Sequence, residues 1–179
     1  LDTLNTYGYI VVFLAIFLLI SQTAQNFLKK VVALVYRYRY LSFFALLIYQ
    51  LVIILSNSVL VYGDTTAIIS NIRGQDASNY FSAFPNNLLY GLYVKGLYHL
   101  VSMKYLVLIQ ELINVLVLDI SILVFANTID KNFGRRLAAI YFTLSILLIG
   151  IHPQFLSTYS DYWSYFTATF VCITIIKMI

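Results

Sequence analysis

The chain has 179 residues, of which 61% are hydrophobic and only 10% are charged. A soluble domain of this length cannot cover so much apolar surface, so the composition excludes an ordinary soluble protein and predicts an integral membrane protein. The formal net charge is +4, and the basic residues cluster beside apolar runs, which indicates membrane topology and not nucleic-acid binding. The single cysteine, Cys172, excludes an internal disulfide and a cysteine-based metal site.

The apolar runs predict an all-α fold, a polytopic transmembrane helical bundle of about five spans in one domain covering residues 1–179. The first span is expected at residues 7–21. A basic segment at residues 29–39 follows, and we assign it to the cytoplasmic side because cytoplasmic loops carry an excess of Lys and Arg. Residues 41–62 then form the second span, which delivers Asp64 to the outer face.

Residues 88–103 are moderately apolar and admit two topologies. If they crossed the membrane, the basic loop at residues 130–136 would lie outside, against the positive-inside tendency. We therefore predict an interfacial helix at residues 88–103, inside an outer loop that spans residues 63–104. Residues 105–126 are the third span and return the chain to the cytoplasmic side.

The last two spans are predicted at residues 137–151, running outward, and residues 166–179, running inward. The segment between them is external and contains Asp161, which therefore shares the outer compartment with Asp64. The chain begins without Met, and its last run is still apolar, apart from Lys177, where it stops. We expect an N-terminal part of a longer protein, and the alternative is a short complete protein that has lost its Met.

Two acids beside predicted spans are the candidate catalytic residues. Asp64 follows the second span, and Asp161 precedes the last. A carboxylate at such a place could act as a general base, and Asp64 could also hold a divalent cation, Mg²⁺ or Mn²⁺. Either acid could instead be an ordinary helix cap, because a short side-chain oxygen satisfies free backbone N–H groups.

The remaining polar features of the outer loop have ordinary explanations beside functional ones. Residues 80–87 place Pro and paired Asn after aromatics, which suits a turn in which Asn86 caps the next helix. Lys95 and His99 lie four apart, so they share one helical face. That face could bind a lipid-linked phosphate, or the two side chains could simply reach toward phospholipid headgroups.

Three polar residues lie inside the third predicted span: Glu111, Asn114 and Asp119. Intramembrane acids normally face the interior of a bundle and pair with another group. Glu111 is close enough to the outer end to reach a cavity there, whereas Asp119 is deeper and is expected to be an interhelical hydrogen-bond partner.

The pattern resembles the GT-C superfamily of polyprenyl-phosphate-sugar-dependent glycosyltransferases, among them Gram-positive members related to the O-mannosyltransferase and aminoarabinose-transferase types. The resemblance covers residues 41–179. It rests on a span ending in Asp64, on Tyr80-Phe81 with Phe84-Pro85-Asn86-Asn87, and on Tyr159-Ser160-Asp161. It implies that Asp64 is the catalytic base or a metal-linked carboxylate and Asp161 a second acid near the donor. The donor-binding residues that it implies are Tyr80, Pro85, Asn86, Asn87 and Tyr159.

The chain departs from that family in two respects. Many relatives have a paired acid in the first outer loop, whereas Thr65 follows Asp64 here. Members also have roughly ten or more spans, compared with the five predicted for this chain, so this chain alone could be active or inactive even where the longer protein is an enzyme.

The resemblance implies an inverting membrane glycosyltransferase of the bacterial plasma membrane and cell envelope, or a fragment of one. It would pass a sugar from a polyprenyl-phosphate donor to an acceptor on the outer face, with membrane lipids around it. The alternative is a non-catalytic membrane protein, either a transporter or flippase component or a structural subunit. In that case Glu111 and Asp119 would form an intramembrane relay, and Asp64 and Asp161 would be only helix caps.

Overall fold

The computed structural model describes residues 21–56, 64–72, 74, 80–151 and 161–178. All regular secondary structure within these ranges is helical, which confirms the predicted all-α class. The described helices are α2 (Gln22–Arg37), α3 (Arg39–Ser56), α4 (Asp64–Ile72), α5 (Tyr80–Ala83), η1 (Pro85–Asn87), α6 (Leu88–Leu100), α7 (Met103–Phe133), α8 (Arg135–Ser145), η2 (Ile146–Gly150) and α9 (Asp161–Met178). Of the predicted first span, residues 7–21, only Ser21 is described.

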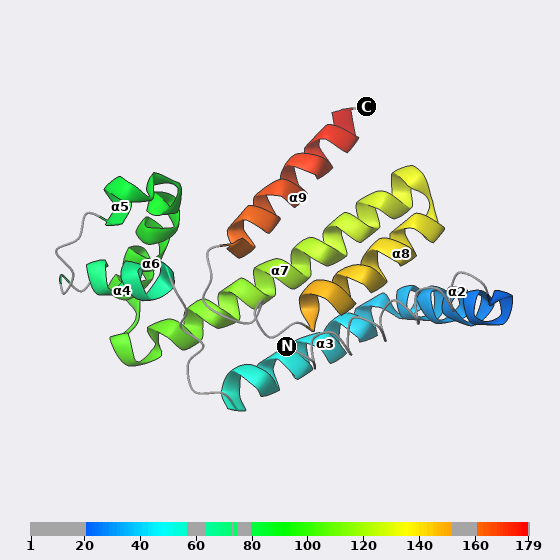
Figure 1. Cartoon of the computed structure of the whole chain (residues 1–179), viewed down its shortest axis with the longest axis horizontal. Coiled ribbons are helices and arrows are strands. Elements are labelled where there is room, and N and C mark those ends of the chain that lie inside the picture. Colours follow the sequence, from blue (N-terminus) through cyan, green and yellow to red (C-terminus); the bar gives the residue numbers. More distant parts are fainter. Residues whose placement is uncertain (1–20, 57–63, 73, 75–79, 152–160, 179) are drawn as a thin grey trace, which may run out of the picture.

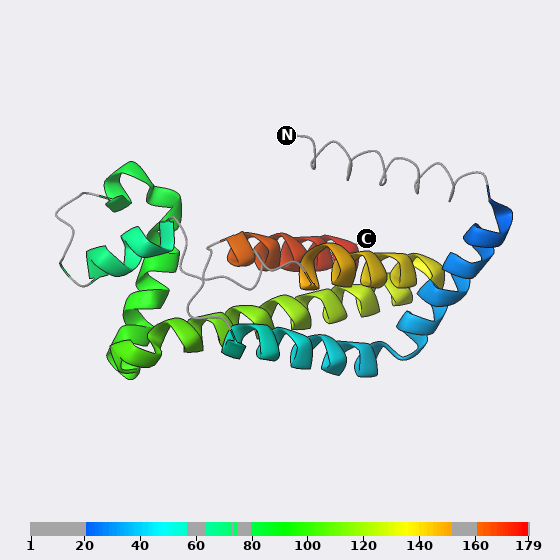
Figure 2. The ribbon, with the colours of Figure 1, turned by 60° about the horizontal axis from the view of Figure 1, so that its bottom comes forward.

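The long helices form a bundle around α7, which packs against α3, α8 and α9. Figure 1 shows that α3, α7, α8 and α9 alternate in direction along the chain, and that α4, α5 and α6 form a group of shorter helices at one end. At the opposite end α2 packs against α8. Figure 2 shows α6 crossing the direction of α7 steeply, as expected for a helix that lies over the end of a bundle.

Two of the described helices are long and apolar enough to cross a membrane, by length and composition. They are α3, with 18 residues, and the 29-residue stretch Tyr105–Phe133 of α7. The fourth and fifth predicted spans are shorter, because α8 has 11 residues before the five-residue π-helical η2, and the apolar part of α9 is Trp163–Met178. A bilayer core requires about 20 residues of helix, so only the second and third predicted spans meet that requirement in the described part.

The predicted loop at residues 130–136 is almost entirely helical. Helix α7 continues to Phe133, and α8 begins at Arg135, so the whole turn is made at Gly134, whose φ is +91°. No residue between the predicted span end and Phe133 breaks a helix, whereas glycine adopts this φ without the steric cost that a Cβ brings. The helix therefore ends at the glycine and not where the apolar run ends.

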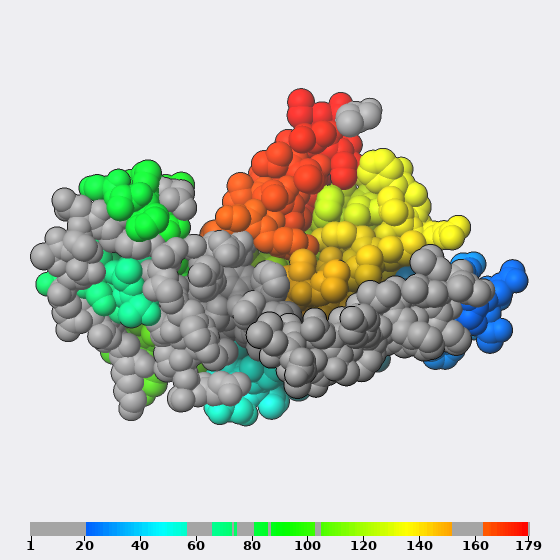
Figure 3. Space-filling view, in the orientation of Figure 1, coloured from blue at the N-terminus to red at the C-terminus, as the bar shows by residue number. Residues whose placement is uncertain are grey.

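The bundle buries polar residues and exposes apolar ones. Along α7 the side chains of Asn114 and Asp119 are both 1% exposed, whereas Leu116, Ile120 and Val124 face outward. Helices α8 and α9, whose surface is visible in Figure 3, also expose large apolar side chains. This distribution suits helices surrounded by lipid, because intramembrane polar groups turn toward the bundle interior. The exposed apolar side chains of α8, η2 and α9 include Leu137, Ile140, Leu144, Leu147, Leu148, Phe170, Val171 and Ile175.

Helix α6 confirms a helix in the predicted interfacial segment. Its buried positions are Tyr90, Gly91 and Val94, whereas Leu89 and Leu92 are exposed. The buried positions arise because α4 and α7 pack against α6 from the side that carries Tyr90 and Val94.

Candidate functional site

The two predicted catalytic acids begin helices. Asp64 is the first residue of α4, and Asp161 is the first residue of α9. An acid in the first turn interacts favourably with the helix dipole, so these positions suit a cap as well as a catalytic group. The placement of both carboxylates lies outside the described part of the structure.

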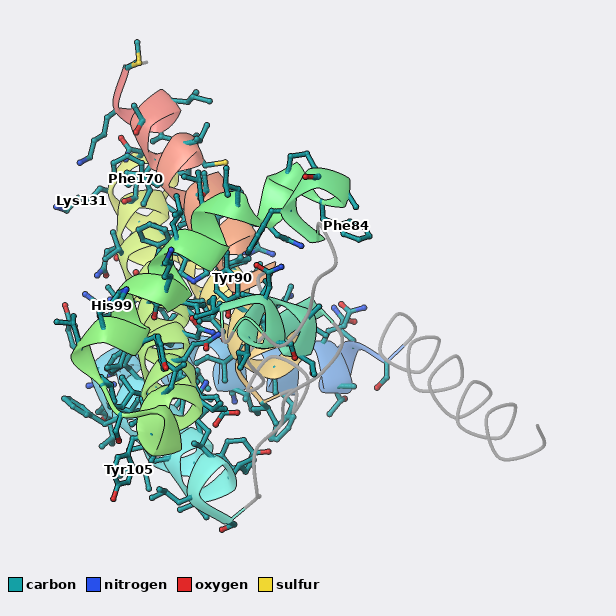
Figure 4. All side chains as sticks on the ribbon, turned by 90° about the vertical axis from the view of Figure 1, so that its left-hand side faces the viewer. Phe84, Tyr90, His99, Tyr105, Lys131 and Phe170 are labelled. Carbon is teal, nitrogen blue, oxygen red and sulfur yellow. The ribbon has the colours of Figure 1, made fainter. Side chains whose placement is uncertain are left out.

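An apolar cluster links α4 and α6 to the first turn of α9, where Trp163 also packs against the central cluster of the bundle around Phe142. Its buried members are Ile68 of α4, Tyr90 and Val94 of α6, and Leu106 of α7, and Trp163 of α9 packs against it. Ile68 lies about one helical turn after Asp64, and Trp163 lies two residues after Asp161. Figure 4 views the molecule from the end that carries α4–α6, with Tyr90 near its centre and Phe84 and His99 toward the edge.

Two buried polar groups of this region have no hydrogen-bond partner among the described residues: the hydroxyl of Tyr93 and the indole Nε1 of Trp163. Their rings lie against each other with centroids 4.9 Å apart. Burial raises the pKa of Tyr93 to about 12, so the hydroxyl keeps its proton at physiological pH. Buried Tyr and Trp normally find a partner, so both groups are candidate donors to a ligand oxygen.

Sequence analysis missed this pair. Trp163 is the only tryptophan of the chain and lies two residues after a candidate catalytic acid, which is a usable signal. Tyr93 is one of 16 tyrosines, and nothing in the sequence distinguishes it from the others.

The aromatic-Pro-Asn-Asn segment forms a compact turn before α6. Tyr80 begins α5, Pro85 is exposed within η1, and Asn87 is 5% exposed. The predicted cap by Asn86 is wrong, because α6 begins at Leu88 and its N-cap residue is Asn87, whose side chain makes no capping hydrogen bond. The side chains of Tyr80 and Asn86, and all of Tyr159, lie outside the described residues.

A second polar cluster lies inside the bundle. The Nε2 of Gln50, on α3, donates to Oδ1 of Asp119 at 3.1 Å and to the carbonyl oxygen of Gly150 at 3.0 Å. Both side chains are buried, and Gly150 ends η2 so close to α3 that a Cβ there would lie 2.8 Å from Leu46 Cδ2. These contacts confirm the predicted role of Asp119 as an interhelical partner. They join α3, α7 and η2 at one point.

Polar side chains also lead along α7 from this cluster toward α6. The Nε2 of Gln110 and the hydroxyl of Tyr90 form a hydrogen bond between α7 and α6. Asn114 lies between Gln110 and Asp119, is 1% exposed, and has no partner for its amide oxygen or nitrogen among the described residues. Glu111 is also buried on this helix, at 4% exposure.

The two exposed basic residues of α6 do not join either cluster, since both Lys95 and His99 face outward. Among the residues that the structure describes, no three His, Cys, Asp or Glu side chains are grouped as a metal-ligand set.

Comparison of the chain with protein-family models, curated proteins and solved structures finds no match. The case for a function therefore rests on the chain's own residues and their geometry.

Proposed function

We propose that the chain is a multi-pass membrane glycosyltransferase of GT-C type, or the N-terminal part of one. It transfers a sugar from a polyprenyl-phosphate-linked donor to an acceptor on the outer face of the membrane. The observation that supports this best is the apolar cluster that contains Ile68 and against which Trp163 packs, because it connects α4 with the first turn of α9. The first residues of these two helices are Asp64 and Asp161.

The charge distribution supports the assignment of the proposed site to the outer side of the membrane. The basic residues of α2 and of the α7–α8 turn lie at the end of the bundle opposite α4–α6. Cytoplasmic segments are enriched in Lys and Arg, so the end that carries α4–α6 is the outer one. A polyprenyl-phosphate donor has its phosphate in the headgroup layer and its sugar in water, and α6 lies across the bundle end where such a donor would be held.

The proposed reaction is a single displacement at the anomeric carbon. Asp64 accepts the proton of the acceptor hydroxyl while the acceptor oxygen bonds to the anomeric carbon, and the bond from that carbon to the phosphate oxygen breaks. In this proposal the indole N–H of Trp163 and the hydroxyl of Tyr93, which have no partner among the described residues, donate to the departing polyprenyl phosphate once the donor is bound. A divalent cation at Asp64, when bound, would neutralise charge on that phosphate.

The test uses membranes containing the full chain and a panel of polyprenyl-phosphate hexoses, and it measures release of free polyprenyl phosphate, the product common to every acceptor. Asp64→Asn should lower the rate at least about 100-fold, the usual contribution of a general base. Asp130→Asn is the matched control, since it removes one carboxylate at the other end of α7 and keeps an oxygen that can accept from Tyr36. Equal rates for Asp64→Asn and the wild type, in a membrane that releases the product, would exclude this mechanism.

The cluster of Gln50, Asp119 and Gly150 favours a second candidate, a transporter or flippase component. A buried carboxylate in a helix long enough to cross a membrane is a typical proton or ion relay. In that case Asp119→Asn should stop translocation of a fluorescent lipid or solute, and Asp64→Asn should have no effect. The opposite pattern favours the glycosyltransferase.

A further inference from the structure

A groove with a volume of about 920 Å³ runs between α2 and α8, at the end of the bundle opposite α4–α6. Its walls are largely apolar and are formed on one side by α2 and on the other by α8. Ligand sites in proteins commonly have volumes of about 300–1,000 Å³. The apolar residues that line the groove are Leu28, Val32, Ala33, Tyr36, Ala139 and Ile140.

Three cations also line the groove: Lys29 from α2, and Arg135 and Arg136 from the start of α8. All three are exposed, and none forms an ion pair or hydrogen bond with another residue in the described ranges. The first turn of α8 contains no acid, so its two arginines lie at the positive end of the helix dipole, and the nearby carboxylate of Asp130 accepts a hydrogen bond from Tyr36. Such an arrangement favours a bound anion.

We propose that this groove binds one anionic phospholipid of the surrounding bilayer. The lipid phosphate would lie among Lys29, Arg135 and Arg136, and an acyl chain would lie along the apolar walls at Val32 and Ala139. Basic grooves beside transmembrane helices on the cytoplasmic side are suited to anionic headgroups. The proposal is independent of glycosyl transfer, which we place at the other end of the bundle.

The combination of walls and charges favours a lipid over other anions. Inorganic phosphate needs only the cations and gains nothing from an apolar groove. A soluble acidic peptide would have to enter at the membrane surface, where bilayer lipid is present at far higher local concentration. An anionic phospholipid uses both the charges and the apolar walls.

Native mass spectrometry of the full chain in mild detergent tests the proposal, with phosphatidylglycerol as the anionic probe and phosphatidylcholine as the neutral one. The wild-type protein should bind phosphatidylglycerol at least tenfold more tightly than phosphatidylcholine. Replacing Lys29, Arg135 and Arg136 together by Gln should lower that affinity about 100-fold, since each cation near a lipid surface contributes about fivefold. The matched control replaces Lys30, Arg37 and Lys131 by Gln, which removes equal charge from the same end but from outside the groove, and it should change the affinity less than fivefold.

A second variant tests the apolar walls. Ala33→Trp, at an exposed position of α2, fills part of the groove without altering any charge, and it should lower phosphatidylglycerol affinity about tenfold. The single change Lys29→Gln, also on the exposed face of α2, gives the same test should the triple variant fail to fold. Equal losses in the groove and control triples would overturn the proposal in favour of general surface charge. Displacement of the lipid by millimolar inorganic phosphate, or full affinity in Ala33→Trp, would overturn it in favour of a simple anion site.

Discussion

Gln50 shows how much one polar side chain can organise inside an apolar helix. Its amide joins α3 to Asp119 of α7 and to the carbonyl of Gly150, so three elements meet at a single nitrogen. Both side chains are fully buried, and an unpaired buried carboxylate is costly. Removal of the glutamine therefore affects more than one hydrogen bond.

We predict that Gln50→Leu lowers the free energy of unfolding by about 1–3 kcal/mol, because Asp119 Oδ1 loses its donor in a buried place. Adding Asp119→Leu should recover part of this lost stability. Denaturant unfolding in detergent measures the double-mutant cycle, and the coupling energy between the two positions should be at least about 1 kcal/mol. The control cycle pairs Gln50→Leu with Asn114→Leu, which is not bonded to Gln50, and it should be additive within about 0.5 kcal/mol. Additivity in both cycles would contradict the assigned bond.

Tyr36 is expected to make a pH-dependent contribution to the free energy of unfolding, at the end of the bundle where α2 packs. Its hydroxyl donates to Asp130 Oδ2 at 3.0 Å, and burial, followed by that hydrogen bond, raises the pKa of Tyr36 from 10.0 to about 12. The folded state thus favours the neutral phenol of Tyr36. The stability that this phenol contributes to the fold is complete below pH 10 and is lost as the pH rises through about 12. Wild type should be more stable than Tyr36→Phe by about 0.5–1.5 kcal/mol at pH 8.

The measurement is denaturant unfolding of both proteins from pH 8 to pH 12. Other tyrosines and lysines titrate in both proteins and cancel in the difference. A stability difference that stays constant up to pH 12, or that grows, would show that Tyr36 does not carry this proton-linked contribution.

At the residue scale, the sequence was informative where a polar group interrupts an apolar run. That criterion found Asp119 and predicted an interhelical partner, and the structure identifies the partner as Gln50. Gln50 itself interrupts α3 in the same way and could have been found by the same criterion. The stacked pair of Tyr93 and Trp163 could not, because it forms only when α6 and α9 meet.

At the scale of the elements, the helices were predictable but their ends were not. The third span was expected at residues 105–126, whereas α7 covers Met103–Phe133, a length of about 46 Å at 1.5 Å per residue. Hydropathy marks where a helix leaves lipid, and the hydrogen-bonded helix continues until Gly134. The buried face of α6 was not predictable for a related reason, since the helices that pack against it are remote in sequence.

Two glycines of α6 allow a direct test of that packing. A Cβ at Gly91 would overlap the ring of Phe81 in α5, whereas nothing lies within 4 Å of a Cβ at Gly96. Gly91→Ala should therefore destabilise the protein by about 1–3 kcal/mol through overpacking, and Gly96→Ala should stabilise it by up to about 1 kcal/mol through helix propensity. Thermal unfolding in detergent measures both, and equal effects of the two substitutions would contradict the packing of α6 on α5.

At the scale of the whole molecule, charge divides the bundle into two ends. Seven of the chain's 11 Lys and Arg residues lie in α2, at the start of α3 and around the α7–α8 turn. Helix α4 lies at the other end, and its Ile68 shares an apolar cluster with Trp163 from the first turn of α9. Charge counting placed Asp64 and Asp161 in one compartment, but the cluster that gathers their helices depends on contacts between distant segments, which no local pattern encodes.

Cysteine cross-linking between positions 64 and 161 is the most direct test of the proposed outer-face site. Asp64→Cys and Asp161→Cys are combined in a Cys172→Ala background. Right-side-out vesicles containing this variant are treated with a membrane-impermeant thiol cross-linker about 10 Å long. That length matches the separation suited to two carboxylates that flank one sugar. We predict a 64–161 cross-link, identified by mass spectrometry of the peptides. The control pair, Asp64→Cys with Lys131→Cys, should give no cross-link, and its residue 131 should react only after permeabilisation. Labelling of position 64 only from the cytoplasmic side, or labelling of 64 and 161 from outside without a cross-link, would contradict the proposed outer-face site.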